Sequence, residues 1–88
     1  MDQKWLLNKP KQMSRETLAA LWHTESQKLL NLAYRMLKNR DEAEDILMDV
    51  FVSVPTAIQN FRGEAAISSW LYRMTINACL MKIRKAKR

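Results

Sequence analysis

The sequence contains 88 residues, of which 48% are hydrophobic, and its 15 Lys and Arg outnumber 9 Asp and Glu to give a net charge of +6. A chain of this length forms one small domain, and a single Cys79 and a single His23 cannot build a disulfide framework or a zinc site. No apolar run approaches the roughly 18 residues of a membrane span, and the polar start lacks the apolar part of a signal peptide, so a cytoplasmic protein is expected.

The chain begins with a polar segment, 1–13, that we expect to be a loosely ordered N-terminal arm, and the helical domain is expected over 14–88. A first helix is predicted over 14–38, because the Ser14 hydroxyl can accept from the first free amides. Apolar residues at three- and four-residue steps place one stripe on this helix. They are Leu18, Leu21, Trp22, Leu29, Leu32, Ala33 and Met36.

A second helix is predicted over 41–54, where Asp41 and Glu44 have the spacing of a capping box. Its apolar stripe consists of Ala43, Ile46, Leu47, Val50, Phe51 and Val54. Its other side is acidic and carries Glu42, Asp45 and Asp49. Pro55 lacks a backbone donor and disfavours helix for the residue before it, so we expect the helix to end or kink there.

Residues 55–66 are predicted to form a turn and loop that holds the only glycine, Gly63. A third helix is predicted over 67–85, capped by Ser68 or Ser69. Its expected core residues are Ile67, Trp70, Leu71, Met74, Ala78 and Met81. A second, partly basic stripe contains Arg73, Asn77, Leu80 and Arg84. Because no segment alternates with period two, the predicted fold class is all-α, a small bundle of three to four helices.

Catalysis is not indicated, since the sequence has no Ser, His and acid constellation and no glycine-rich phosphate loop. Carboxylates spaced along one helix are more often a solvated face than a metal cluster. We interpret His23 as a partly buried helix residue and Cys79 as a small core residue. The chain is therefore predicted to be a non-enzyme without a cofactor.

The excess positive charge lies entirely at the C-terminal end, where residues 62–88 contain seven Lys and Arg against Glu64 alone. Aromatic side chains interleaved with cations are typical of single-strand binding. These are Phe61, Trp70 and Tyr72 with Arg62, Arg73, Lys82 and Arg84. Core packing is the favoured alternative for Trp70 and stays open for Phe61 and Tyr72. Asn77, one turn from Arg73, offers a donor and an acceptor to a base edge, although a scaffold role is also open.

Three ordered blocks carry a resemblance to a known family. They are YRMLKNRDEAEDILMDVF at 34–51, FRGE at 61–64 and WLYRMTIN at 70–77. In this order and spacing the chain, from about residue 17 to 88, resembles region 2 of the extracytoplasmic-function sigma factors of bacterial RNA polymerase. The resemblance implies a transcription initiation module that binds core RNA polymerase and recognises and melts the promoter minus-ten element, with one non-template base flipped into a protein pocket.

The resemblance also implies residue roles. Docking on the clamp helices of the largest polymerase subunit would involve Glu44, Asp45, Met48 and Asp49. Contacts to promoter DNA, including the single-stranded non-template strand, would involve Ala57, Phe61, Arg62, Gly63, Glu64, Ala65, Arg73, Asn77, Lys82 and Arg84. An anti-sigma factor is a further candidate partner, and no membrane contact is expected.

The sequence departs from the family pattern at two places: Met48-Asp49 stand where Gln-Glu is frequent, and Pro55 stands where an aromatic residue is common. The family's helix-turn-helix domain does not occur in these 88 residues, so we expect either an excised domain or a solitary region 2 protein. The alternative function is a region 2-like interaction module, a partner of an anti-sigma factor or of a separate sigma subunit, without sequence-specific DNA readout.

Overall fold

The structure is a computed structural model, and it describes residues 13–61 and 66–87. Most of these residues are helical. The helices are α2 (Arg15–Leu37), α3 (Arg40–Ala57) and α4 (Ile67–Ala86), with a short 3-10 helix, η1 (Ile58–Asn60), after α3. Over these residues no strand occurs, which confirms the all-α prediction. The predicted arm, apart from Met13, and the loop residues Arg62, Gly63, Glu64 and Ala65 lie outside the described ranges.

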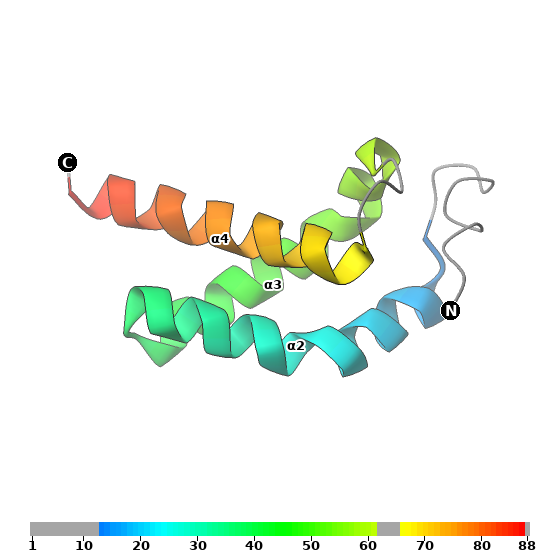
Figure 1. The fold of residues 1–88 in the computed structure, drawn as a ribbon, viewed down its shortest axis with the longest axis horizontal. Helices are drawn as coiled ribbons and strands as arrows, with labels where there is room; N and C mark the ends of the chain where they lie inside the picture. Colours follow the sequence, from blue (N-terminus) through cyan, green and yellow to red (C-terminus); the bar gives the residue numbers. More distant parts are fainter. Residues whose placement is uncertain (1–12, 62–65, 88) are drawn as a thin grey trace.

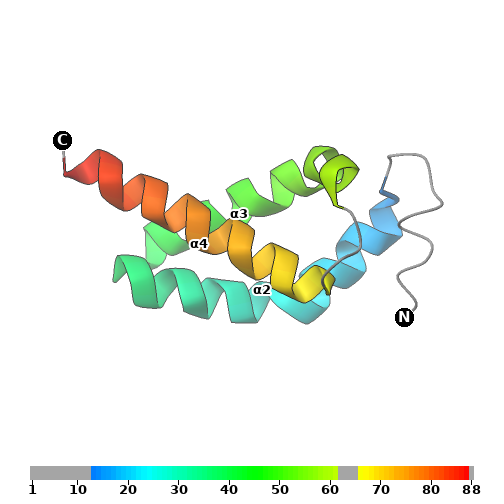
Figure 2. The same cartoon turned by 45° about the horizontal axis from the view of Figure 1, so that its top comes forward.

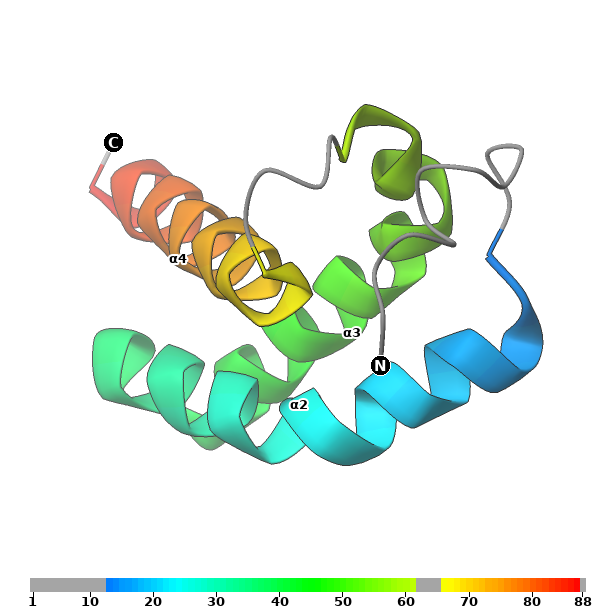
Figure 3. The ribbon, with the colours of Figure 1, turned by 45° about the vertical axis from the view of Figure 1, so that its right-hand side comes forward.

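Each helix packs against the other two. α2 and α4 run lengthwise in the same general direction across the view of Figure 1, and α3 passes behind them. A view turned about the horizontal axis shows α4 crossing in front of α3 (Figure 2). Looking nearly along α4, Figure 3 shows this helix seated on the pair formed by α2 and α3. No helix within the described ranges is both long and apolar enough to span a membrane.

The N-terminal caps of α2 and α3 come from their own segments. The Ser14 hydroxyl accepts from the Thr17 amide at 3.1 Å, which confirms the predicted start of α2. The predicted capping box at Asp41 is wrong, because Asn39 is extended (φ −146°) and its Oδ1 accepts from the Glu42 amide at 2.9 Å. The Glu44 carboxylate pairs instead with Arg40, at 3.1 Å.

α3 does not stop at Val54, which was one of the two outcomes predicted for Pro55. The helix continues to Ala57 and tightens into η1. Pro55 removes one amide donor from the last turn of α3. The Ile58 amide still donates a hydrogen bond to the carbonyl of Val54, the residue before Pro55. A single lost hydrogen bond near the C-terminal end is tolerated because the preceding turns of α3 are anchored in the core.

The start of α4 also differs from the prediction, since neither Ser68 nor Ser69 caps it. Ala66 is the N-cap residue and makes no side-chain hydrogen bond. The Ser68 hydroxyl donates instead to a carboxylate oxygen of Glu25 on α2, at 3.0 Å. This hydrogen bond joins the first turn of α4 to α2.

The core confirms the predicted stripe of α3, all six residues of which are buried. The buried cluster contains Leu29, Ala33, Ala43, Ile46, Leu47, Val50, Phe51, Val54, Leu71 and Cys79. Thr75 is buried as well and donates to the Leu71 carbonyl at 2.9 Å, so its hydroxyl is satisfied inside the helix. Burial raises the pKa of the Cys79 thiol, and the core position predicted for Cys79 is confirmed.

Three positions depart from the predicted core. Met81 is 56% exposed, because a step of two residues from Cys79 turns it away from the buried stripe of α4. His23 is exposed and not partly buried as predicted. Trp22 keeps one exposed side and lies edge-on against Phe51, with ring centroids 5.0 Å apart.

Candidate functional site

The outer face of α4 is formed by Arg73, Asn77, Leu80 and Arg84, all of which are exposed. These residues recur at steps of four, three and four, so they share one side of the helix, opposite the buried residues Leu71 and Thr75. The predicted basic stripe is therefore present as an accessible surface. It presents two guanidinium groups with an amide between them.

An aromatic pair lies at the start of the α4 outer face. Phe61 follows η1, where its amide donates to the Ile58 carbonyl at 3.1 Å, and its ring packs on Trp70 with centroids 5.3 Å apart and a 49° tilt. Both side chains are half-buried, as is Ala57 at the end of α3. Trp70 precedes Asn77 by seven residues, about 10 Å along the helix and on nearly the same side. The structure thus brings Phe61 into line with the α4 outer face.

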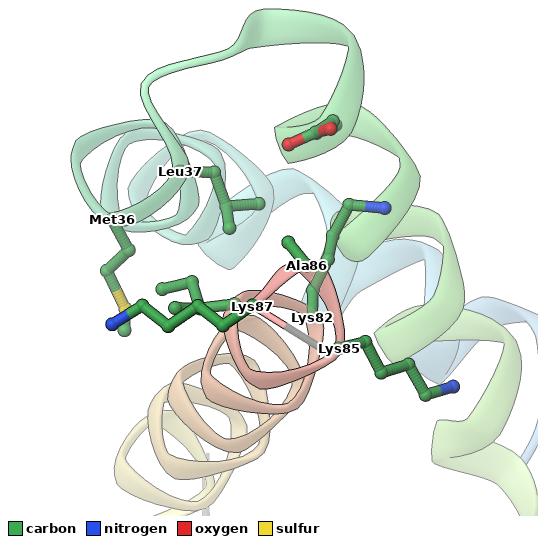
Figure 4. A pocket seen from close by; sticks show the side chains of 8 residues that line it. Met36, Leu37, Lys82, Lys85, Ala86 and Lys87 are labelled. Carbon is green, nitrogen blue, oxygen red and sulfur yellow. The ribbon is translucent and has the colours of Figure 1, made fainter.

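Lys82 lies away from this surface. Its side chain is half-buried and lines a pocket of about 490 Å³ at the C-terminal end of α4. The residues of this lysine pocket are Met36, Leu37, Glu42, Lys82, Ile83, Lys85, Ala86 and Lys87. Figure 4 shows Lys87 on the Met36 side of the pocket and Lys82 and Lys85 on the other side. Of the predicted DNA contacts, Lys82 is therefore separated from Arg73, Asn77 and Arg84.

The outer face of α3 carries the four residues assigned to polymerase binding. Glu44, Asp45, Met48 and Asp49 are all exposed, and Met48 is 52% exposed. Val52 is 73% exposed beside them and was not among the residues predicted for this face. The sequence does indicate this position: Val52 follows Met48 by four residues, so it shares the side of the helix that carries the acids and not the buried stripe. The face combines exposed apolar groups with a rim of carboxylates.

A shallow apolar groove of about 630 Å³ adjoins the α3 outer face. Its lining residues are Arg15, Leu18, Ala19, Trp22, Met48, Phe51, Val52 and Pro55. Two helices build it, so no single periodic segment of the sequence indicates it. Met48 and Val52 belong to both surfaces, which makes the groove and the acidic rim one continuous region.

Comparison with known proteins agrees with this architecture. The model of the family Sigma-70 region 2 matches residues 21–88. The ECF RNA polymerase sigma factor SigM of Mycobacterium tuberculosis is 37% identical over 67 residues, which cover 76% of this chain and 34% of that protein. The ECF RNA polymerase sigma factor SigW of Bacillus subtilis is 42% identical over 60 residues, covering 68% and 32%.

The family model covers well over half of the chain, and its span includes α3, α4 and most of α2. The chain belongs to the Sigma-70 region 2 family and to its extracytoplasmic-function branch. It spans about a third of the length of these two relatives.

Proposed function

We propose that this chain is a sigma region 2 module that binds core RNA polymerase through the α3 outer face and the promoter minus-ten element through the α4 outer face. Family membership supports the proposal, as do the names of the relatives, which are RNA polymerase sigma factors. The observation that carries it is the alignment of Arg73, Asn77 and Arg84 on one exposed side of α4, next to the Phe61–Trp70 pair.

Capture of an unpaired base explains promoter opening without catalysis. Extruding a base costs a few kcal/mol, and a site that accepts only the unstacked base offsets this cost. Arg73 and Arg84 are placed to neutralise phosphates, Phe61 to offer an aromatic surface and Asn77 to donate to and accept from a base edge. Arg62 and Gly63 to Ala65, outside the described ranges, remain proposed members of this site. Melting is then selective binding of the open strand.

The α3 outer face suits a basic protein surface. Asp45 and Asp49 lie along one side of the exposed side chains of Met48 and Val52, and Glu44 lies on the other, so apolar contact would have an acidic border. The proposed partner is the pair of clamp helices of the largest polymerase subunit. Glu44 is already paired with Arg40 and is expected to contribute less than the two aspartates.

The DNA part of the proposal is tested with Asn77→Ala. Loss of a good base contact costs about 1–3 kcal/mol, so affinity for a minus-ten non-template oligonucleotide should fall about 5- to 150-fold, with little change for a scrambled strand. Asn31→Ala, at an exposed position on α2, is the matched control and should change neither. Equal losses on both strands would contradict base readout.

The polymerase part is tested with Asp45→Lys and Asp49→Lys in a pull-down with core RNA polymerase. Both side chains are exposed, so the variants should fold normally and yet bind the polymerase more weakly. Glu16→Lys, an equivalent charge reversal on exposed α2, should bind like the wild type. Unchanged retention of both aspartate variants would refute the assignment of this face.

The apolar groove favours a second candidate function, a protein-interaction module without DNA readout. Trp22, Met48 and Val52 expose apolar surface that an amphipathic helix of an anti-sigma factor or a separate sigma subunit could cover. Single-strand affinity that lacks sequence preference, with a salt dependence that reports only the C-terminal cations, would favour this second function over the first.

A further inference from the structure

Glu25 is the one charged side chain that is buried within the described residues, with 7% of its surface exposed. It lies on α2 four residues after Leu21 and four before Leu29, on the side of the helix that faces the core. Its carboxylate accepts a hydrogen bond of 3.0 Å from the Ser68 hydroxyl on α4. Removing a carboxylate from water is costly, so a buried acid at this position calls for a role.

The N-terminus of α4 differs from those of the other two helices. Ser14 and Asn39 cap α2 and α3 through their own side chains, whereas Ala66 offers α4 no side-chain hydrogen bond. The first amides of a helix and its dipole form a positive end that favours a nearby negative charge. Because Glu25 reaches the first turn of α4 through Ser68, its charge lies at this uncapped end.

The same turn of α4 carries the aromatic pair of the candidate DNA site. Trp70 follows Ser68 by two residues, and its ring packs on Phe61. A continuous set of contacts therefore runs from the Glu25 carboxylate through Ser68 and the first turn of α4 to Phe61. The position of this turn relative to α2 decides where the aromatic pair lies.

We propose that Glu25 is a positioning residue for base capture. Its carboxylate holds Ser68, and thereby sets where α4 begins and how Trp70 and Phe61 are aligned with Asn77. This inference rests on the proposed function and deepens it. Glu25 is a buried residue of α2 that affects the α4 outer face by fixing the position of the first turn of α4.

Two variants test the role of Glu25. Glu25→Gln keeps an acceptor for Ser68 and removes the charge, while Ser68→Ala removes the donor. In each, the amides of Trp70 and Leu71, which are the first in α4 to donate within the helix, should exchange with solvent about three- to tenfold faster than in the wild type, while exchange in α3 is unchanged. Preference for the minus-ten strand over a scrambled strand should fall by a similar factor, because misalignment affects the captured base more than phosphate contacts.

Controls separate positioning from general loss of structure. Ser68→Thr keeps the hydroxyl and should retain both exchange rates and strand preference. Gln27→Ala, which removes an exposed hydrogen bond to Asn31 on the same helix, should change neither measurement. The double variant of Glu25→Gln and Ser68→Ala should lose no more strand preference than the more severe single variant, because Glu25 is proposed to act on α4 through Ser68 alone.

The outcomes that overturn the inference differ from those that overturn the proposed function. Unchanged exchange of the Trp70 and Leu71 amides in both variants rejects the positioning role, whether or not DNA binds. Unchanged strand preference in both, against a wild type that discriminates, rejects it as well. A wild type that binds both strands equally rejects base readout, and amide exchange then decides alone whether Glu25 positions α4.

Discussion

The backbone is strained at Lys38, between α2 and α3. Replacing this residue by glycine is therefore expected to raise the free energy of unfolding, whereas most substitutions lower it. Lys38 is the C-cap of α2 with φ 59° and ψ 27°, and its amide donates to the Tyr34 carbonyl at 2.7 Å. Among the described residues it is the only non-glycine position with positive φ. The left-handed region costs a residue with a Cβ about 1–2 kcal/mol, a cost that glycine avoids.

Lys38→Gly is therefore expected to stabilise the domain. The relief of about 1–2 kcal/mol is reduced by roughly 0.4–1 kcal/mol, because glycine increases the freedom of the unfolded chain. The net gain is about 1 kcal/mol, which corresponds to a rise in Tm of about 4–8 °C for a domain of this size. Thermal unfolding followed by circular dichroism, together with urea titration, measures both quantities.

Two control variants isolate the backbone effect. Lys28→Gly places the same substitution at an exposed position inside α2, where glycine should destabilise by about 0.7 kcal/mol. Lys38→Ala removes the charge and side chain but keeps the Cβ, so it should not reproduce the gain. A Lys38→Gly variant that melts at or below the wild-type temperature, or an equal gain from Lys38→Ala, would refute the strain argument.

Three further predictions concern stability. Leu71→Ala opens a cavity at a fully buried position and should cost about 2–5 kcal/mol in urea unfolding; a loss well below 1 kcal/mol would contradict the observed core. Asn39→Ala removes the α3 cap and should cost about 1 kcal/mol, whereas Asp41→Ala should cost less if Asn39 is the true cap. Burial raises the pKa of the Cys79 thiol above its ordinary value of 9.0, so this thiol's contribution to stability is present below pH 9 and is lost as pH rises further. Urea unfolding between pH 8 and 10 should weaken more in the wild type than in Cys79→Ala, and parallel curves would contradict that assignment.

Local sequence patterns predicted most of the fold because helix formation and burial of one stripe depend on neighbours three and four residues away. The buried stripe of α3, from Ala43 to Val54, is the clearest case. The exposed side of α4 followed from the same rule, since Arg73 and Asn77 could not share a face with Leu71. The rule that a proline ends a helix did not hold at Pro55, because the packing of α3 in the core outweighs the loss of one amide donor.

Several features of the candidate site depended on how the helices pack against each other. Lys82 and Arg84 lie on different sides of the C-terminal end of α4. Lys82 faces the pocket that residues of α2 and α3 also line, whereas Arg84 faces outward. The apolar groove exists only where α2 lies beside α3. Glu25 occupies a core position that an acid tolerates because Ser68, 43 residues later, meets it.

The amino-acid order alone determined the three amphipathic helices of the described residues, the acids on α3 and the excess of cations that follows α3 in the sequence. Each of these properties is local or additive along the chain. Tertiary structure decided which polar groups meet across helices and which apolar side chains stay uncovered. Such contacts join residues far apart in sequence, and their geometry depends on helix crossing, to which no short window of sequence is sensitive.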